Sequence, residues 1–319
     1  MKSFNILLTC SSNKTQLIQW TKKSISKLSC KIKVFAGDTN SNVQSKYFCD
    51  KFWHMPTCNK KNYPKILRYC KKNKIKIIIP SSDKELKFWS HFKDNLRKNQ
   101  IFVMISEPNT VSTCLDKLKF YKKLNDFDFI VFTSKNINDF NKKQTLIRKN
   151  RYGMGSRNIV VGKKEELIDK KLVNNNYKNQ IFQKYINFKN EVSIDCYFSE
   201  KNKLLKIVPR TRSLIIQGES AITTVINDKL FFYKIELIAS RLKFTGHIMF
   251  QCFIHKRKVL IFECNPRIGG GSIMSLYNKM DTIYFFIIES LFPELNLKIR
   301  RKIFTNSKLL IYKNNKFFK

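Results

Sequence analysis

Hydrophobic positions in the first hundred residues form short apolar runs separated by amphipathic stretches. Four apolar runs have the length of buried strands: Phe4–Thr9, Ile32–Phe35, Ile75–Ile79 and Phe102–Ile105. Three stretches with helical periodicity lie between them: Thr15–Lys27, Tyr63–Lys72 and Lys84–Leu96, the last capped by Ser82-Asp83. Strands that alternate with helices of this length predict a parallel sheet of Rossmann type.

The rest of the chain follows a different pattern, a small unit and then a strand-rich one. A helix is expected to begin at Ser112 or Thr113 and to end at Leu124. Seven strand signals follow: Phe129–Phe132, Thr145–Lys149, Ile181–Tyr185, Glu191–Phe198, Leu204–Pro209, His247–Ile254 and Val259–Cys264. Between the fifth and sixth of these, residues 230–242 are expected to be helical.

The composition is that of a globular protein. The 319 residues are 43% hydrophobic and 13% aromatic, which excludes a disordered basic tail. No apolar run approaches the ~18–20 residues needed to span a bilayer, and we expect no signal peptide at Met1–Phe4. Nine cysteines without a C-x-x-C pair fit neither a disulfide framework nor a zinc site. We therefore expect a cytoplasmic protein.

Positive charge is in large excess, with 62 Lys and Arg against 23 Asp and Glu, or a net charge of +39. Such a charge suits polyanion or anionic-membrane binding, because Lys and Arg neutralise phosphates. The lysines are nevertheless spread from end to end, beside an excess of Asn, Ile and Phe. A/T-rich codons favour these residues, so a bias in genome composition explains much of the charge without a partner. Both explanations stay open.

The strongest chemical signal is the segment Val259–Ser272. Because side chains i and i+2 of a strand share a face, Glu263 and Asn265 are expected to point the same way. A carboxylate and an amide oxygen so placed suit Mg²⁺ that bridges nucleotide phosphates. Pairing with the preceding strand would bring Gln251 beside Glu263, and Arg267 would brace a transferring phosphoryl group. The alternative is a polar strand end followed by a glycine turn.

A second signal is the segment Lys149–Arg157, in which Gly153, Gly155 and Ser156 form a Gly-x-Gly-Ser turn. Such a turn presents backbone N–H groups to phosphates, and Lys149 adds positive charge. The segment is not a P-loop, since G-x-x-x-x-G-K-[ST] does not occur in it. Taken alone, it also fits an ordinary turn between strands. The loop after the first strand, Cys10–Asn13, lacks glycine, so we place no dinucleotide there.

Together these segments resemble the ATP-grasp superfamily, specifically one synthetase unit of the carbamoyl-phosphate synthase large subunit. The resemblance runs from the first strand to Ser272 and is specific because its landmarks occur in order. They are Pro80–Leu86, Asp116-Lys117, Lys149 with Gly153–Arg157, Gln183–Ile186, Glu191 with Asp195, Pro209–Arg212, Gly218-Glu219, Gln251 and Glu263–Ser272.

The resemblance implies an ATP-grasp fold of α/β and α+β type. It implies a Rossmann-like pre-ATP-grasp domain over residues 1–111, a small lid subdomain over 112–182 and a C-terminal subdomain with the Mg/phosphate site over 183–319. Three features depart from the family: Asn150 stands where a proline is usual, the first loop lacks its glycine, and the segment 126–150 is short. We therefore expect a trimmed lid.

The resemblance also implies roles for single residues. Nucleotide contacts fall to Lys117, Lys149, Gly153, Gly155, Ser156, Gln183, Tyr185, Ile186 and Glu191. Among these, the lysines and the glycine loop would hold the phosphates, the hinge 183–186 would read adenine, and Glu191 would hold the ribose. The implied ligands of Mg²⁺ (or Mn²⁺) are Gln251, Glu263 and Asn265. The implied catalytic residues are Arg267, with Arg210 and Arg212 facing the acyl phosphate or an acidic substrate; surface charge is the alternative for this pair.

By resemblance, the protein is an ADP-forming carboxylate–amine ligase that uses ATP and Mg²⁺. A complete carbamoyl-phosphate synthase is not expected, because that large subunit needs two such units. Alternatives are a carbamoyl- or carboxyphosphate-forming kinase, and a non-catalytic nucleotide- or polyanion-binding protein. The expected partners are small-molecule carboxylate and amine substrates and a second copy in a homodimer, without specific nucleic acid or a membrane span. The acceptor pocket is expected between Ser81–Glu85 and the arginines Arg210 and Arg212.

Overall fold

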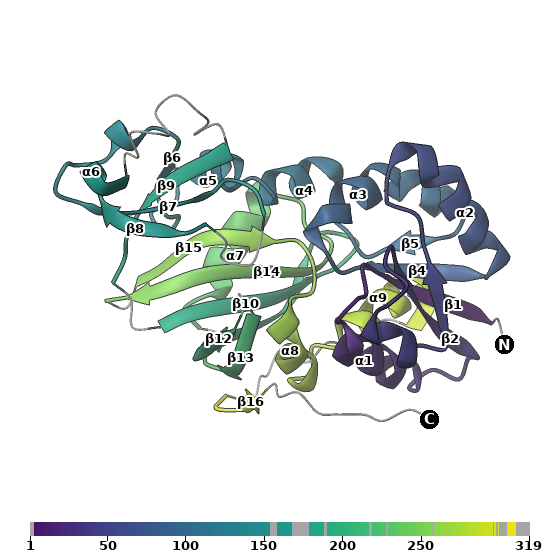
Figure 1. The fold of residues 1–319 in the computed structure, drawn as a ribbon. Helices are drawn as coiled ribbons and strands as arrows, with labels where there is room; N and C mark the ends of the chain where they lie inside the picture. Colours follow the sequence, from purple (N-terminus) through teal and green to yellow (C-terminus); the bar gives the residue numbers. More distant parts are fainter. Residues whose placement is uncertain are drawn as a thin grey trace.

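The computed structural model describes residues 3–153, 158–167, 179–187, 190–216, 219–227, 229–256, 258–295, 297, 299 and 305–310. Two lobes are visible in Figure 1, with the N-terminal sheet on the right and a larger antiparallel sheet with its small neighbour on the left. Short 3₁₀ helices occur at Gln44–Tyr47, Lys60–Asn62, Ile137–Asp139, Gly270–Ser272 and Pro293–Leu295.

The N-terminal lobe contains a five-stranded parallel sheet with the strand order β3-β2-β1-β4-β5. Its strands are β1 (Phe4–Thr9), β2 (Ile32–Asp38), β3 (Lys51–His54), β4 (Ile75–Pro80) and β5 (Phe102–Val103). Helix α1 (Thr15–Ile25) packs on one face, and α2 (Tyr63–Lys72) and α3 (Asp83–Lys98) pack on the other. The predicted parallel sheet of Rossmann type is confirmed.

Helix α3 begins with a capping box, which fixes the direction of its first turn. Ser82 is the N-cap, and the Glu85 carboxylate accepts hydrogen bonds from the backbone N–H groups of Ser81 (3.0 Å) and Ser82 (3.3 Å). Glu85 also accepts a 2.8 Å bond from the indole of Trp89. Such reciprocal bonds satisfy donors that a helix start leaves unpaired. Asp83, the first helical residue, is held in place by this arrangement.

Two helices replace the single one expected up to Leu124: α4 (Pro108–Cys114) and α5 (Lys117–Leu124). The break falls at Asp116, whose backbone is extended and whose carboxylate accepts 3.1 Å bonds from the N–H groups of Leu118 and Lys119. A short acidic side chain caps a helix in this way because its carboxylate accepts hydrogen bonds from the N–H groups that the first turn leaves unpaired. The expected start at Ser112 or Thr113 is therefore wrong.

A small antiparallel sheet, which we call the lid sheet, has the strand order β6-β9-β7-β8. Its elements are β6 (Thr133–Ser134), β7 (Thr145–Asn150), β8 (Val160–Lys163), α6 (Lys164–Leu167) and β9 (Gln180–Lys184). Its core is small, with Phe140, Leu146, Leu167 and Phe182 buried. The strand expected at Phe129–Phe132 is present only as an isolated bridge between Ile130 and Ile261.

The larger antiparallel sheet has the strand order β11-β10-β14-β15. Its strands are β10 (Asn190–Phe198), β11 (Leu204–Thr211), β14 (Gly246–His255) and β15 (Lys258–Asn265). Helix α7 (Phe232–Arg241) covers its apolar face, where Val192, Ile194, Phe250 and Ile261 are buried. A further sheet is formed by β12 (Leu214–Ile216), β13 (Glu219–Thr224) and β16 (Lys308–Leu310).

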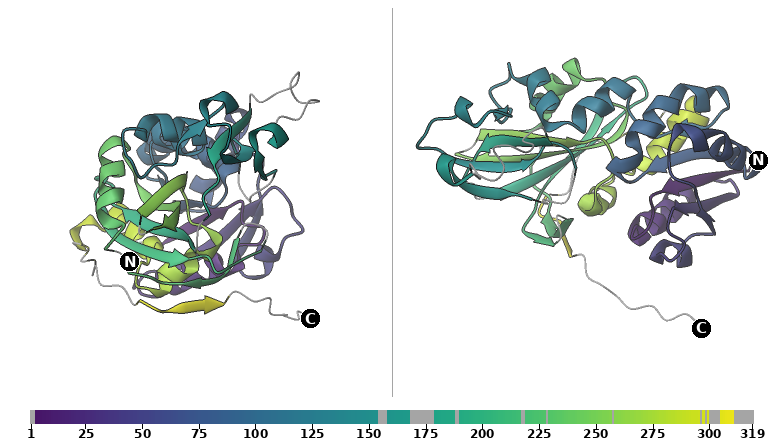
Figure 2. Two further views of the ribbon diagram at one scale, coloured as in Figure 1. Left: turned by 90° about the vertical axis from the view of Figure 1, so that its left-hand side faces the viewer. Right: turned by 45° about the horizontal axis from the view of Figure 1, so that its top comes forward.

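The last helices, α8 (Ile273–Tyr277) and α9 (Thr282–Leu291), return to the N-terminal lobe. They share one hydrophobic core with α1 and with the strands β1, β2 and β4, and Figure 2 shows them beside the purple N-terminal strands. Asp281, just before α9, accepts a 2.6 Å bond from Ser24 and a 2.5 Å bond from Lys27. The lobes are therefore joined by a continuous core. No helix among the described residues is long and apolar enough to span a membrane.

Candidate functional site

The site is built on the polar face of the β11-β10-β14-β15 sheet. Gln251 on β14 lies directly opposite Glu263 on β15, and Met249 lies opposite Asn265. On the other side of β14, Gln251 lies opposite Ser193 of β10. Glu263 and Asn265 therefore share one face with Gln251, as the strand period requires. The sequence predicted this neighbourhood correctly.

Two lysines reach this face from outside the sheet. The Lys117 ammonium, at the start of α5, lies 3.5 Å from Glu263 Oε1 and donates a 2.9 Å bond to the carbonyl oxygen of Gly153. Lys149, on β7, is buried with its ammonium 4.8 Å from the centre of the Phe262 ring. Both expected phosphate contacts therefore lie close to the expected metal ligands.

Burial lowers the pKa of Lys149 to about 8, because an ammonium loses its hydration there. The negative charges of Glu263 and Glu191 oppose this shift, while the charge of Lys117 adds to it. These four groups therefore lie within electrostatic reach of one another. A lysine with a lowered pKa beside carboxylates is typical of a functional site, although buried ion-pair networks also produce one.

The turn after β7 is held at its base by Asp116, for which the sequence analysis assigned no role. The carboxylate of Asp116 accepts bonds of 2.7 and 2.6 Å from the Arg151 guanidinium and a 3.0 Å bond from the Tyr152 hydroxyl. Burial alone would raise the pKa of Asp116, but the hydrogen bond from Arg151 leads a set of interactions that lower it below its ordinary value. The sequence pattern Asp116-Lys117, one of the landmarks of the resemblance, was the signal that could have indicated a role for Asp116. Gly155 and Ser156 lie outside the described residues.

The expected hinge residues connect the lid sheet to the larger sheet. Gln183 is buried and donates a 2.7 Å bond from its side-chain amide to Thr133 Oγ1. Tyr185 donates its backbone N–H to the carbonyl oxygen of Thr145, and its side chain is partly exposed. Ile186 packs against a cluster that contains Phe253 and Phe262. The backbone after β9 therefore passes close to the ring that lies beneath Lys149.

Glu191 and Arg212 are directly paired. The Arg212 guanidinium forms an ion pair with the Glu191 carboxylate, and its Nε donates a 3.0 Å bond to Ser220 Oγ. Because Glu191 acts electrostatically on Lys149, this pair belongs to the edge of the same site. Arg212 therefore links the expected ribose-binding carboxylate to the strand β13.

Arg210 occupies a different environment from the one expected. Its side chain is fully buried, and its Nε donates a 2.7 Å bond to Asp195, which also accepts 2.6 Å bonds from Ser272 and Ser275. Burial would raise the pKa of Asp195, but the charge of Arg210 and a hydrogen bond from His247 hold it far below its ordinary value. The expectation that Arg210 contacts a substrate is corrected: its charge compensates a buried carboxylate.

Arg267 reaches from the end of β15 to the N-terminal lobe. Its Nε donates a 2.5 Å bond to Asp83, the first residue of α3, and its Nη1 donates a 3.1 Å bond to the carbonyl oxygen of Ile268. The backbone N–H of Arg267 bonds to the carbonyl oxygen of Asn265 at 2.8 Å. The guanidinium is therefore held between the start of α3 and the backbone that follows β15.

The residues present fit a magnesium ion that is shared with a nucleotide. Glu263, Gln251 and Asn265 offer oxygen ligands on one face, and oxygen is what Mg²⁺ prefers. Among the described residues, no group of three or more His, Cys, Asp or Glu side chains could hold a metal by itself. The remaining ligands would come from phosphate oxygens.

Two family models match separate parts of the chain. Residues 6–104 match the PylC-like N-terminal domain, and residues 177–303 match the family described as ATP-grasp in the biosynthetic pathway with Ter operon. No curated protein matches the sequence significantly.

Solved structures with a similar fold cover almost the whole chain. N5-carboxyaminoimidazole synthetase from Staphylococcus aureus complexed with ADP has 16% identity and a TM-score of 0.72, over 96% of this chain and 82% of that one. The biotin carboxylase domain dimer of Hydrogenobacter thermophilus 2-oxoglutarate carboxylase, with MgADP, ADP and bicarbonate, has 14% identity and a TM-score of 0.71, over 97% and 74%. The N5-carboxyaminoimidazole ribonucleotide synthetase from Thermotoga maritima has 13% identity and a TM-score of 0.62, over 95% and 78%.

Proposed function

The chain belongs to the ATP-grasp superfamily, and we propose that it is an ATP- and Mg²⁺-dependent ligase that activates a carboxylate as an acyl phosphate and passes it to an amine or similar nucleophile. The observation that carries the proposal is the convergence of Lys117 and Lys149 on the Gln251–Glu263 pair. Two cations and an oxygen-ligand set on one sheet face suit a magnesium-bound polyphosphate.

Within this proposal, the side chains position the nucleotide and neutralise the charge of its phosphates. Lys117 and Lys149 bind the phosphates, and Glu263 with Gln251 and Asn265 would hold Mg²⁺, which when bound neutralises charge on the transferred phosphoryl group. The backbone after β9 receives the adenine, and Glu191 receives the ribose. Arg267, whose backbone N–H bonds to the carbonyl oxygen of Asn265, would neutralise charge on the phosphoryl group while it passes from ATP to the carboxylate. Orientation of the reactants supplies much of the rate.

We assign these tasks to three units: residues 1–111, the lid unit 112–182, and the unit 183–319 that carries the metal ligands. The acceptor would enter where Arg267 meets α3, at Ser81–Glu85. Arg212 is paired with Glu191, so it would neutralise the negative charge of a substrate only from that position. A homodimer stays a prediction.

Bicarbonate is our first candidate for the acid. The similar structures are those of carboxyaminoimidazole synthetases and of a biotin carboxylase domain, the latter in complex with bicarbonate. The acyl phosphate would then be a carboxyphosphate. The same intermediate would form in the alternative function, that of a carbamoyl- or carboxyphosphate-forming kinase. The amine would determine which product forms.

Isotope transfer tests the proposal without knowledge of the amine. The purified protein is incubated with Mg·ATP and each of a set of ¹⁸O-labelled acids, starting with bicarbonate, with and without an amine mixture. We expect ADP together with phosphate that carries one oxygen from the acid, because the carboxylate attacks the γ-phosphorus. Formation of AMP, or ADP release that no acid changes, would contradict an acyl-phosphate mechanism.

A further inference from the structure

Arg267 already binds a carboxylate of the protein itself. Its Nε lies 2.5 Å from Asp83 Oδ1, and the side chains are only 9% and 12% exposed. An ion pair this far removed from water is costly to break on one side alone, because the remaining charge stays poorly solvated. Any anion that uses Arg267 therefore has to share the guanidinium with Asp83 or displace it.

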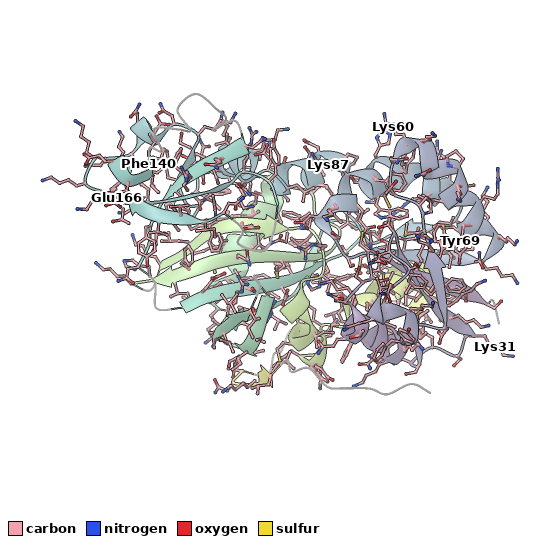
Figure 3. All side chains as sticks on the ribbon, viewed as in Figure 1. Lys31, Lys60, Tyr69, Lys87, Phe140 and Glu166 are labelled. Atoms are coloured by element: carbon pink, nitrogen blue, oxygen red, sulfur yellow. The ribbon has the colours of Figure 1, made fainter. Side chains whose placement is uncertain are left out.

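The position of Asp83 is fixed by the start of α3. It is the first residue of α3, whose start is tied down by Ser82 and Glu85. One turn further along α3, the Lys87 ammonium lies 5.8 Å from the centre of the Tyr152 ring, at the base of the turn after β7. Figure 3 shows Lys87 on this helix between the two lobes. The first turns of α3 therefore reach from Arg267 to Tyr152.

We propose that Asp83 competes with the phosphoryl group for Arg267, so that Asp83 makes this arginine selective for dianions over monocarboxylates. The inference rests on the proposed function, in which Arg267 would neutralise charge on the transferred phosphoryl group. A carboxylate ligand carries the same single charge as Asp83 and gains little by the exchange. A phosphate dianion carries about two charges and three acceptor oxygens, and it pairs with a guanidinium through two bonds.

The opposite role for Asp83 makes the opposite prediction. If the carboxylate only oriented Arg267, its loss would weaken every anion at this position. If it competes, its loss removes one negative charge from beside Arg267, and any anion binds more tightly. The sign of the change in anion affinity therefore separates a competitor from a positioning residue.

The test uses inorganic phosphate, which is a product of the proposed reaction whatever the acid and amine. Phosphate and, separately, acetate are titrated by calorimetry into the full-length protein saturated with Mg·ADP. We expect Asp83→Asn to bind phosphate about tenfold more tightly and acetate more tightly by a larger factor, which reduces the preference for phosphate. An equal or smaller gain for acetate would overturn the selectivity. Arg267→Gln should weaken both anions.

Asp94→Asn is the matched control, since Asp94 is an exposed residue of the same helix. It makes the same change of charge about 16 Å further along the helix axis, and we expect it to behave like the wild type. Asp83→Ser repeats the test with a side chain that keeps a hydrogen-bond acceptor at the helix start. Unfolding curves without ligand identify any variant that does not fold.

The two proposals fail in different ways. Absence of Mg·ADP binding in the wild type overturns the proposed function. Normal Mg·ADP binding, with Asp83→Asn and Asp83→Ser binding phosphate no more tightly than Asp94→Asn, overturns the competition alone. The competition is also overturned if the Asp83 variants and the Asp94→Asn control all bind Mg·ADP normally but do not bind phosphate.

Discussion

The Lys117 ammonium lies 3.5 Å from the Glu263 carboxylate, and both side chains are largely buried. A cation from the start of α5 thus compensates the charge of an expected metal ligand on β15. In the proposed function Glu263 would hold Mg²⁺, and Lys117 would then be available to a nucleotide phosphate. We therefore propose that this contact couples metal binding to phosphate binding.

We predict that Lys117→Gln weakens ATP binding and strengthens metal binding without nucleotide. Loss of a charge-assisted bond to a phosphate costs roughly 1.5–3 kcal/mol, or about 10- to 100-fold in affinity. Without Lys117, Glu263 attracts a divalent cation more strongly, which titration with Mn²⁺ followed by electron paramagnetic resonance would detect. The control is Lys119→Gln, an exposed lysine of the same helix. Equal effects of the two substitutions would contradict the assignment.

Burial of Lys149 should make stability depend on pH. Its pKa is about 8 in the folded protein, against an ordinary value of 10.5, so the unfolded chain binds more protons between these values. The contribution of this group to the free energy of unfolding therefore rises as the pH increases from 8 to 10.5. Well below pH 8 the group destabilises the fold by roughly 3 kcal/mol.

Lys149→Met should accordingly be more stable than the wild type at pH 7, and the difference should shrink as the pH approaches 10.5. Urea unfolding at pH 7 and 9.5 measures this change, with Lys184→Met, an exposed lysine on β9, as the control. The same variant should lose ATP affinity at pH 7. A stability difference that is constant with pH would show that the Lys149 ammonium is not perturbed.

The ion pair of Asp116 and Arg151 should contribute far more to the free energy of unfolding than an exposed ion pair does. Their side chains are 2% and 14% exposed, whereas those of Asp126 and Arg241 are 47% and 50% exposed. Asp116→Asn should destabilise the protein by about 2–4 kcal/mol, because it leaves Arg151 poorly compensated, and Asp126→Asn by less than about 1 kcal/mol. Urea unfolding checks both values, and similar costs would contradict a larger contribution from the buried pair of Asp116 and Arg151.

Local signals allowed much of the fold to be predicted. Helix α2 has the predicted bounds Tyr63–Lys72, since its apolar period and Pro64 are contained in the segment itself. The pairing of Gln251 with Glu263 was equally accessible, because a short hairpin connects their strands. In contrast, β3 was missed: it has only four residues, and two of them are exposed.

Contacts between distant residues could not be predicted. Asp83 and Arg267 are 184 positions apart. In the sequence, Asp83 fits an ordinary helix start and Arg267 fits an active-site arginine, and nothing indicates that they form a pair. Arg210 was misassigned because a chain so rich in Lys and Arg gives no sign of which arginine is buried. Its partner Asp195 also accepts bonds from Ser272 and Ser275, which lie 77 and 80 positions away in the sequence.

Gly271 should tolerate alanine poorly. A Cβ atom there would lie 2.6 Å from Arg210 Nη1, and Asp195 holds that guanidinium in place. A Cβ at Gly162 would meet Glu166 Oε2 at a similar 2.7 Å, but Glu166 is exposed and can turn away; Figure 3 labels it at the outer edge of the lid sheet. We expect Gly271→Ala to cost about 1–3 kcal/mol and Gly162→Ala less than about 1 kcal/mol in thermal or urea unfolding. Equal costs would mean that Arg210 can move.

Thermal unfolding with ATP, in the presence and absence of Mg²⁺, tests the nucleotide site most directly. A ligand at 100 times its Kd stabilises the folded state by about 2.7 kcal/mol, which gives a clear shift of Tm. We predict a Mg²⁺-dependent shift in the wild type and in Glu166→Ala, and its loss in Glu263→Ala. A wild type that ATP and Mg²⁺ do not stabilise, or a Glu263→Ala variant that shifts as much as the wild type, would contradict a magnesium–nucleotide site on β15.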